Sequence, residues 1–457
     1  MSNPGDIDAT PITSVQQLAD YIALGCKPAA AFRIGTEHEK FGFRQADLAP
    51  PPYAADDHAA IRDVLEALCD QGAKPIIEAG NIIGLRQGRA SISLEPGGQL
   101  ELSGAPVETV HETAAELEAH FAQVRQSGER LGVGFVPLGF HPTAPRASMP
   151  WMPKGRYAIM GRYMPRVGQL GLDMMTRTCT VQVNLDYGSE EDMRRKLRVS
   201  LALQPLATAL FANSPFTEGR PNGYLSYRAH IWSDTDPDRS GMPAVFFEEG
   251  FGFRRYAEWL IDDVPMYFVH RADQYIDVAG RSFRAFMAGN VPELRGITAT
   301  LGDFADHMTT AFTDVRVKRF LEMRGADAGS PAMMAALPAF WTGLLYDEAA
   351  LEAAYRLVGR WSRADCLALR EAVPKQGLES RSPAGRLRDL ARDALAIARD
   401  GLQSRAITKA GSADEALYLE PLDAIARGLP VQAEHWLQSY YGRWDGDVNR
   451  IFAEAAI

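Results

Sequence analysis

The residues best spaced for chemistry lie at positions 32–43, in the stretch Phe-Arg-Ile-Gly-Thr-Glu-His-Glu-Lys-Phe-Gly-Phe. If this stretch is a strand, its side chains alternate between two faces, so Glu37 and Glu39 lie on one face and His38 and Lys40 on the other. The aromatic residues at both ends favour a packed strand. Two carboxylates on one packed face repel each other unless a cation lies between them, and Mg²⁺ prefers carboxylate, water and phosphate ligands. The spacing indicates a magnesium site, although the solvated face of a half-exposed strand more commonly explains this spacing alone.

A second acidic pattern lies at residues 91–103, where Ser-Ile-Ser-Leu-Glu and Gln-Leu-Glu-Leu-Ser flank a Pro-Gly-Gly turn. The turn predicts a hairpin in which the two segments fold back on each other. Glu95 then ends one strand, and Gln99 and Glu101 share a face of the next strand. Two more carboxylates are thereby brought together, although a solvated hairpin would have the same pattern.

Two further strands are predicted at residues 177–187 and 315–327. Alternation places Gln182 and Asn184 on one face of the first strand, which gives it a polar surface for a ligand. Glu322 and Arg324 share a face of the second strand. They could combine a metal ligand with a guanidinium group that holds phosphate oxygens, or they could form a simple salt pair.

Basic side chains gather at residues 151–175, where Arg156 and other cationic residues alternate with methionines. In an acidic protein this local positive charge suggests an anion site, while core methionines with arginines at their rim explain it equally well. The polar segment 220–243, which carries Arg228, has the length expected of a substrate loop. A further strand at 263–270 would hold Tyr267 near its middle.

Together these patterns supply five carboxylates on separate strands and arginines that could neutralise a transferring phosphoryl group. Such a set is typical of phosphoryl transfer assisted by two or three magnesium ions. The sequence contains no Gly-x-x-x-x-Gly-Lys-Ser/Thr motif, so the transfer would proceed without a P-loop.

Composition narrows the class of protein. The 457 residues have a formal net charge of −10, which argues against nucleic acid or an anionic membrane as the main partner. No apolar run has the length of a membrane span, and the first residues lack the features of a signal peptide. Four scattered cysteines predict a reducing compartment. From these features we expect a cytoplasmic protein.

The predicted secondary structure divides the chain into two parts. Residues 1–330 alternate between strands and helices, which predicts a catalytic sheet core with flanking helices. Residues 331–457 have apolar residues at helical spacing throughout, which predicts a helical region packed on that core. We expect the two parts to form one continuous domain.

Several long motifs closely resemble the plant and proteobacterial type of glutamate-cysteine ligase, and the likeness runs from about residue 14 to the C-terminus. The motifs are Ile34-Gly-Thr-Glu-His-Glu-Lys-Phe-Gly-Phe43, Leu94-Glu-Pro-Gly-Gly-Gln-Leu-Glu-Leu-Ser-Gly-Ala-Pro106, Tyr163-Met-Pro, Gly171-Leu-Asp-Met-Met, Arg177-Thr-Cys-Thr-Val-Gln-Val-Asn-Leu-Asp-Tyr187 and Leu321-Glu-Met-Arg-Gly-Ala-Asp327. The resemblance implies an α+β fold like that of glutamine synthetase, with a curved antiparallel β-sheet forming a funnel and helices outside it.

The resemblance also implies a reaction, the first step of glutathione synthesis. ATP phosphorylates the γ-carboxyl of L-glutamate, and the amine of L-cysteine attacks the resulting acyl phosphate. The implied partners are therefore these three small molecules, acting on a monomer or homodimer.

Roles for individual residues follow from the same resemblance. Two or three Mg²⁺ ions would be surrounded by Glu37, Glu39, Glu95, Glu101, Gln182 and Glu322. ATP phosphates or glutamate carboxylates would contact Arg156, Arg228 and Arg324. The amino-acid substrates would be bound by Tyr267, Arg177, Asn184 and Lys40.

Three alternatives stay open at this stage: a ligase of the same fold with another amine acceptor, a catalytically inactive relative that binds ligands, and a guanidino kinase with a related core. The long motifs do not suit the kinase, and the inactive relative would lack acids that this chain retains.

One departure from the plant pattern is Ala335, which stands where plant members can carry a regulatory cysteine. A thiol switch of that kind is therefore not expected.

Overall fold

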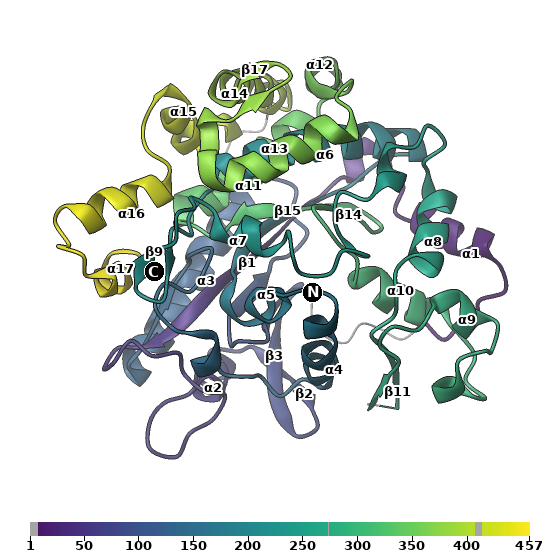
Figure 1. Cartoon of the computed structure of the whole chain (residues 1–457), viewed down its shortest axis with the longest axis horizontal. Helices are drawn as coiled ribbons and strands as arrows, with labels where there is room; N and C mark the ends of the chain where they lie inside the picture. Colours follow the sequence, from purple (N-terminus) through teal and green to yellow (C-terminus); the bar gives the residue numbers. More distant parts are fainter. Residues whose placement is uncertain (1–7, 273, 407–413) are drawn as a thin grey trace.

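The computed structural model describes residues 8–272, 274–406 and 414–457. Its centre is a sheet in the strand order β14-β15-β7-β1-β5-β4-β3-β2, with β6 paired to β1 (Figure 1). All pairings within this sheet are antiparallel, which confirms the predicted antiparallel sheet. Its strands are β1 (Ile34–Arg44), β2 (Lys74–Glu78), β3 (Asn81–Gln87), β4 (Ala90–Leu94), β5 (Leu100–Ser103), β6 (Val133–Val136), β7 (Thr180–Leu185), β14 (Val315–Val317) and β15 (Leu321–Asp327).

Strand β1 lies inside the sheet because it pairs with β7 along its first half, with β5 along its middle and with β6 along its end. The register places Glu37 opposite Gln182 and Glu39 opposite Glu101. Directly opposed residues of an antiparallel pair point to the same face. The alternation predicted from the sequence therefore brings acids and an amide from three strands to one face.

The helices surround the sheet. They are α1 (Val15–Ala23), α2 (Ile61–Cys69), α3 (Val110–Leu131), α4 (Gly155–Tyr163), α5 (Gly171–Arg177), α6 (Glu190–Leu210), α7 (Tyr227–Ile231), α8 (Phe253–Asp262), α9 (Phe283–Met287), α10 (Leu301–Thr309), α11 (Pro331–Leu345), α12 (Glu348–Val358), α13 (Arg363–Gln376), α14 (Leu387–Ser404), α15 (Glu420–Arg427), α16 (Gln432–Tyr441) and α17 (Ile451–Glu454). In Figure 1, α6 and α11–α15 lie along the top of the view, and α1 and α8–α10 lie on the right.

Short two-stranded ribbons lie outside the main sheet: β8 (Phe216–Thr217) with β9 (Arg220–Pro221), β10 (Ser240–Gly241) with β13 (Phe312–Thr313), β11 (Phe268–Arg271) with β12 (Gln274–Asp277), and β16 (Arg381–Ser382) with β17 (Gly385–Arg386). Only the pair of β10 and β13 among them is parallel.

Local sequence explains where the two longest helices begin. The Thr109 hydroxyl accepts a hydrogen bond from the Glu112 N–H, and the Glu112 carboxylate accepts one from the Thr109 N–H, so a capping box starts α3. Ser189 caps α6 in a similar way by accepting from the Asp192 N–H. These caps fix the helices that pack on the face of the sheet opposite the acids.

The hydrophobic core crosses the predicted boundary at residue 330. Helix α11 contacts β7, β1 and α3, and its residues from Met333 to Leu345 are all buried. The largest core cluster contains residues from Leu18 to Phe452. The division into a sheet core and a helical region stays a prediction, while the apolar packing joins the two.

Three predicted strands differ from those observed. The strand expected at 315–327 is a hairpin, in which β14 (Val315–Val317) pairs with β15 (Leu321–Asp327). The strand expected at 177–187 begins at Thr180, because α5 extends to Arg177 and the Thr176 and Thr178 hydroxyls donate back to carbonyls one helical turn earlier. The strand expected at 263–270 is β11, which begins after Tyr267. Pro265 has no N–H to donate to a neighbouring strand.

Within the described ranges, no helix combines the length and the apolar composition needed to cross a bilayer. All four cysteines are free: Cys26 and Cys69 are half-buried, and Cys179 and Cys366 are buried.

Candidate active site

One cavity collects most of the residues predicted for the site. It has an empty volume of about 770 Å³, open solvent at its mouth included, which is large enough for a small substrate. Of the predicted residues, its wall contains Glu37, Glu39, Glu95, Glu101, Gln182, Arg156, Arg228 and Arg324. The other lining residues are Pro96, Gln99, Tyr157, Met160, Met174, Met175, Thr178, Thr180, Trp232, Thr309, Phe312 and Arg316.

The acids on β1, on β5 and at the end of β4 form one wall. The Glu39 carboxylate accepts a hydrogen bond from the Thr180 N–H at 3.0 Å, and the Glu101 carboxylate accepts one from the Ser103 hydroxyl at 2.6 Å. Burial, followed by the charges of Glu95 and Glu101, raises the pKa of Glu39 well above its ordinary value. Burial and Glu95 likewise raise the pKa of Glu101. This wall therefore favours a proton or an added cation.

The donor chemistry of this wall fits Mg²⁺. Within the part of the chain that the structure describes, no group of three or more His, Cys, Asp or Glu side chains forms a ready metal cluster. Mg²⁺ is commonly held by one or two carboxylates together with water and substrate phosphates, without a cage made only of protein ligands. Crowded carboxylates with raised pKa values are compatible with that shared mode of binding.

A second wall is basic, and its residues Arg316 and Arg324 both pair with Glu322, which is fully buried outside the cavity lining. Its carboxylate pairs with Arg316 at 2.6 Å, with Lys318 at 3.0 Å and with Arg324. Although burial alone would raise the pKa of Glu322, these three cations hold it well below its ordinary value. Arg324 also donates to the Gln182 side-chain carbonyl at 2.7 Å. Glu322 thus orients guanidinium groups toward the cavity.

Glu322 itself is not on the cavity wall. The predicted salt pair with Arg324 is present, while the predicted role as a metal ligand stays a prediction. Direct contact with Mg²⁺ would require Glu322 to release one of its three cationic partners.

Arg228 and Arg156 reach the cavity from helices. Arg228 lies in α7 and donates from Nη2 to the Arg324 carbonyl at 2.9 Å, while its Nε has no hydrogen-bond partner among the described residues. Burial lowers the pKa of Arg228. Arg156 lies in α4, with its guanidinium group 5.1 Å from the centre of the Phe268 ring, and its Nε also lacks a partner within the described chain. Both arginines keep hydrogen-bonding capacity for an anionic ligand.

Two predicted substrate ligands, Lys40 and Asn184, lie on β1 and β7 without lining the cavity. Lys40 is buried on the other face of β1, where its Nζ donates to the Leu100 carbonyl at 3.1 Å, and burial lowers its pKa to about 7. Asn184 lies on the acidic face, but its amide donates to Glu37 at 3.0 Å. The geometry gives Asn184 a supporting position beside Glu37 and places Lys40 away from the cavity, so their roles as substrate ligands stay predictions.

Arg177 and Tyr267 also lie away from the cavity wall. Arg177 pairs with Asp173 at 3.0 Å, and its guanidinium group lies 4.6 Å from the centre of the Phe140 ring. The Tyr267 hydroxyl donates to Asp236 at 3.0 Å. Arg177 ends α5 and Tyr267 precedes β11, and the substrate-binding roles that the resemblance implies for them stay predictions.

Several wall residues were not predicted. Arg316 lies between two valines in β14, directly opposite Glu322 in β15. A charged residue flanked by β-branched apolar residues, six positions before its partner Glu322 across the turn, was an available signal. Gln99 is a second case: its amide donates to the Met175 and Thr178 carbonyls. It thereby ties the Pro-Gly-Gly turn to the end of α5.

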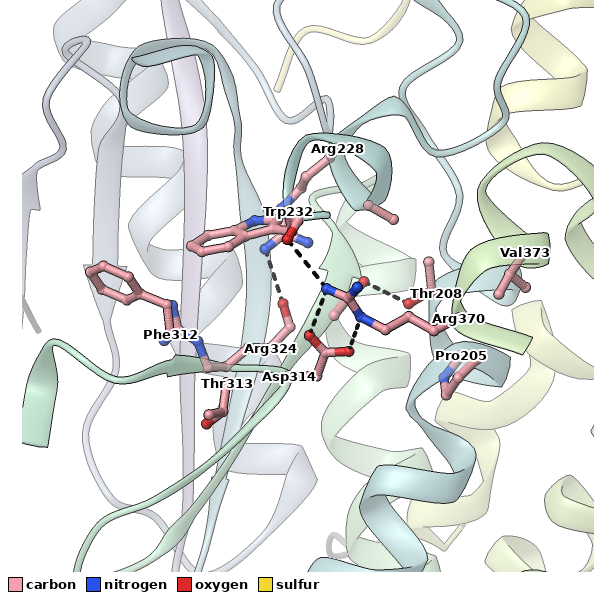
Figure 2. A pocket seen from close by; sticks show the side chains of 12 residues that line it. Pro205, Thr208, Arg228, Trp232, Phe312, Thr313, Asp314, Arg324, Arg370 and Val373 are labelled. Atoms are coloured by element: carbon pink, nitrogen blue, oxygen red, sulfur yellow. Dashed lines mark hydrogen bonds and ion pairs between the residues drawn. The ribbon is translucent and has the colours of Figure 1, made fainter. Parts of the chain in front are cut away.

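A second compartment adjoins the cavity behind its arginines and has an empty volume of about 470 Å³, open solvent included. Figure 2 shows how its lining residues converge from α6, α7, α13 and the segment before β14. It shares four residues with the cavity, namely Arg228, Trp232, Phe312 and Arg324. Arg228 and Arg324, the two catalytic candidates among these four residues, therefore line both compartments.

Comparisons with known proteins agree with the motifs. The model of the glutamate-cysteine ligase family 2 matches residues 33–454. Glutamate–cysteine ligase B, chloroplastic, of Oryza sativa subsp. japonica is 50% identical over 445 residues, which are 97% of this chain and 87% of the relative. Glutamate–cysteine ligase, chloroplastic, of Arabidopsis thaliana is 49% identical over 447 residues, 98% of this chain and 83% of the relative.

Among solved structures, the glutamate–cysteine ligase of Francisella tularensis in complex with AMP superposes with a TM-score of 0.55. The sequence identity is 11%, and the match covers 93% of this chain and 88% of that chain. This likeness shows that the two proteins share a fold.

The predicted cytoplasmic location is contradicted by the plant relatives, which are chloroplastic proteins. The prediction relied on scattered cysteines and on the absence of a signal peptide. Neither feature separates one reducing aqueous compartment from another.

Proposed function

The chain belongs to glutamate-cysteine ligase family 2, and from its cavity we propose how its own residues carry out the reaction of that family. The enzyme forms γ-glutamylcysteine from L-glutamate and L-cysteine with ATP as co-substrate, in the synthesis of glutathione. The observation that carries our assignment of roles is the convergence of four carboxylates and three predicted arginines on one cavity.

The acidic wall is the proposed metal side of the site. Glu37, Glu39, Glu95, Glu101 and Gln182 would hold two or three Mg²⁺ ions jointly with ATP phosphates, and Glu322 would join them only by exchanging a cationic partner. Bound Mg²⁺ would neutralise phosphate charge and make the γ-phosphorus more electrophilic. Support comes from the raised pKa values of Glu39 and Glu101, which indicate carboxylates that need added positive charge.

The basic wall is the proposed phosphoryl side. A γ-carboxylate oxygen of glutamate attacks the γ-phosphorus as the bond to the ADP oxygen breaks, and negative charge spreads over the transferring oxygens. Arg156, Arg228 and Arg324 are placed to stabilise that charge, since preorganised guanidinium donors act more strongly in a partly enclosed cavity than in bulk water. The cysteine amine then attacks the acyl carbon, phosphate leaves, and the nitrogen loses a proton.

The low-dielectric surroundings of Arg228 and Arg324 support this assignment. Burial lowers the pKa of both groups, so each would gain from an anionic ligand. We also propose that the enzyme acts as a monomer or homodimer, because one chain supplies every residue assigned here.

The acceptor amine is the part of the reaction to test first. Purified protein with ATP, Mg²⁺ and L-glutamate is assayed for ADP release and for the product by mass spectrometry, with cysteine compared against alanine, glycine and 2-aminobutyrate. We expect the highest kcat/KM with cysteine, together with the mass of γ-glutamylcysteine. A preference for another amine would identify a ligase with a different acceptor, and absence of any ADP release would identify an inactive relative.

A further inference from the structure

A half-buried ion pair lies beyond the catalytic arginines, between Arg370 of α13 and Asp314 just before β14. Arg370 donates from Nε to one carboxylate oxygen at 2.7 Å and from Nη2 to the other at 3.2 Å. Figure 2 shows this pair among the side chains that line the second compartment. Helix α13 belongs to the C-terminal region, for which the sequence predicted no chemistry.

Asp314 fixes the backbone of Arg324. Its carbonyl accepts a hydrogen bond from the Arg324 N–H at 3.1 Å, and its own N–H donates to the Gly241 carbonyl at 2.8 Å. A shift of Asp314 would therefore move the strand segment from which Arg324 projects.

Arg370 also fixes α7, which carries Arg228. Its Nη2 donates to the Trp232 carbonyl at 3.3 Å, and the Trp232 N–H donates to the Arg228 carbonyl at 3.2 Å. Trp232 is the C-terminal cap of α7, so the contact holds the end of a five-residue helix whose own backbone bonds are few.

These contacts close a ring. The Arg370 side chain contacts Trp232 and Asp314, and the Asp314 carbonyl accepts a hydrogen bond from the Arg324 N–H. The Arg228 side chain completes the ring by donating to the Arg324 carbonyl at 2.9 Å. In Figure 2, dashed lines mark the contacts of Arg370 with Asp314 and the Trp232 carbonyl, and that of Arg228 with the Arg324 carbonyl. Neither Arg370 nor Asp314 lines the catalytic cavity.

The chemistry of the pair suits positioning. A planar guanidinium group that meets a carboxylate through two donors fixes direction as well as distance, which a lysine cannot do. The Arg370 and Asp314 side chains are 21% and 14% exposed, so water competes weakly for them.

We propose that Arg370 and Asp314 are positioning residues that hold Arg228 and Arg324 in the geometry for phosphoryl transfer. The proposal rests on the proposed role of those two arginines, and it gives the C-terminal helical region a part in catalysis. A displacement of about 1 Å can cost on the order of a hundredfold in rate, so the pair need not touch a substrate to matter.

The test begins with Arg370→Gln, assayed by ADP release at saturating glutamate and cysteine. We expect kcat to fall at least about tenfold, while the KM for ATP stays within about twofold because the acidic wall is unchanged. The matched control is Arg363→Gln on the same helix, whose side chain donates to the Met242 carbonyl and is expected to leave kcat unchanged. Wild-type kcat in Arg370→Gln would overturn the proposal, whereas inactive wild-type protein would overturn the proposed function instead.

A double-mutant cycle between residues 370 and 324 distinguishes a positioning role of Arg370 from a general effect on the stability of the protein. In an Arg324→Lys background we expect Arg370→Gln to cost less than about threefold further, because the group that it positions is already lost. Full additivity of the two losses would contradict the proposal.

A double variant without either charge covers the case in which Arg370→Gln unfolds because Asp314 is left as a half-buried, unpaired charge. The double variant Asp314→Asn/Arg370→Gln removes both charges and is expected to raise the thermal midpoint above that of the single variant while kcat stays low. Recovery of kcat together with stability would show a merely structural role.

Discussion

At the residue scale, the cavity separates its charges into two walls. Carboxylates crowd on one side, where burial and mutual repulsion raise the pKa values of Glu39 and Glu101. On the other side, Glu322 gathers Arg316, Lys318 and Arg324. A phosphate chain with bound Mg²⁺ could lie between the two walls, with its cations toward the acids and its oxygens toward the arginines.

Arg324 is the residue of the basic wall with the most defined contacts. We expect Arg324→Lys to lower kcat at least about tenfold, because a lysine cannot keep its contacts to Gln182 and Glu322 and also present a fork to phosphate oxygens. The measurement is steady-state ADP release.

The matched control is Arg195→Lys in α6, where the arginine bridges Glu348 at 2.7 Å and Glu352 at 3.0 Å outside the cavity. An Arg324→Lys enzyme as active as this control would remove Arg324 from the proposed machinery.

Side-chain alternation predicted the face of Glu37 and Glu39 correctly, because both line the cavity while Lys40 is buried on the other face. It could not predict the partners of Glu322, since these come from the neighbouring strand and depend on the hairpin register. Arg228 was expected in a loop and lies in a short helix. A helix of this length has few backbone hydrogen bonds of its own, so its formation depends on tertiary contacts that the sequence pattern does not show.

At the element scale, the turn between β4 and β5 sets one edge of the cavity. Gly97 approaches the chain so closely that an added Cβ would lie 2.3 Å from the Thr176 carbonyl oxygen. The Gly97 N–H donates to the Gln99 side chain at 2.8 Å, and Gln99 in turn binds the end of α5. The glycine therefore lets the hairpin and the helix meet beside Glu95.

We expect Gly97→Ala to lower the stability and to reduce activity, because backbone must move to admit the methyl group. The cost should be on the order of 1–3 kcal/mol, as for other overpacked sites. Urea midpoints and the kcat of the soluble variant provide the measurement.

Gly250→Ala is the control, since a Cβ at Gly250 meets nothing within 4 Å. Equal stability and activity in the two variants would contradict the role given to the turn.

The sequence predicted most of the elements that build the site, since β1, β5, β7 and β15 all follow alternating patterns. It was wrong about the start of the strand at Arg177, because the stretch around this residue has high β propensity while α5 extends to it. Propensity alone does not decide between a helix end and a strand start when tertiary packing favours the helix.

At the scale of the whole molecule, the sheet and the C-terminal helices share one core. The fold class predicted from the resemblance is confirmed by the structure and by the F. tularensis relative. The contribution of α13 to the arginine side of the site was not predictable, because the apolar spacing of a helix does not reveal which polar side chain points inward. We propose that the chain is one domain in which the helical region supports the catalytic sheet.

Buried histidines link the stability of the whole molecule to pH. His307 of α10 donates from Nε2 to the Leu260 carbonyl of α8 at 2.8 Å, and burial lowers its pKa from 6.5 to about 4. Because the unfolded chain binds the proton more readily, this contribution is fully present above pH 6.5 and is lost as the pH falls toward 4. The loss from this one group should be about 2 kcal/mol at pH 5.

The variant His307→Gln keeps an amide donor for Leu260 and lacks the titration. We expect the stability difference between wild type and His307→Gln, measured by urea unfolding, to shift by that amount between pH 7.5 and pH 5. A difference that is the same at both pH values would contradict the assignment.

The central claim is that acids from separate strands bind metal together with ATP, and binding of Mn²⁺ in place of Mg²⁺ tests it most directly. Electron paramagnetic resonance gives the Mn²⁺ affinity in the presence of a non-hydrolysable ATP analogue for wild type, Glu39→Gln and Glu116→Gln. Glu116 is the control, because it is a partly buried glutamate of α3 that accepts a hydrogen bond from the Ala105 N–H at 2.9 Å outside the cavity.

We expect Glu39→Gln to keep the fold, to weaken Mn²⁺ binding at least about tenfold and to abolish turnover, because a neutral amide is a poor ligand for a hard cation. The Glu116→Gln control should bind Mn²⁺ like wild type. Wild-type Mn²⁺ affinity and turnover in Glu39→Gln would contradict the account.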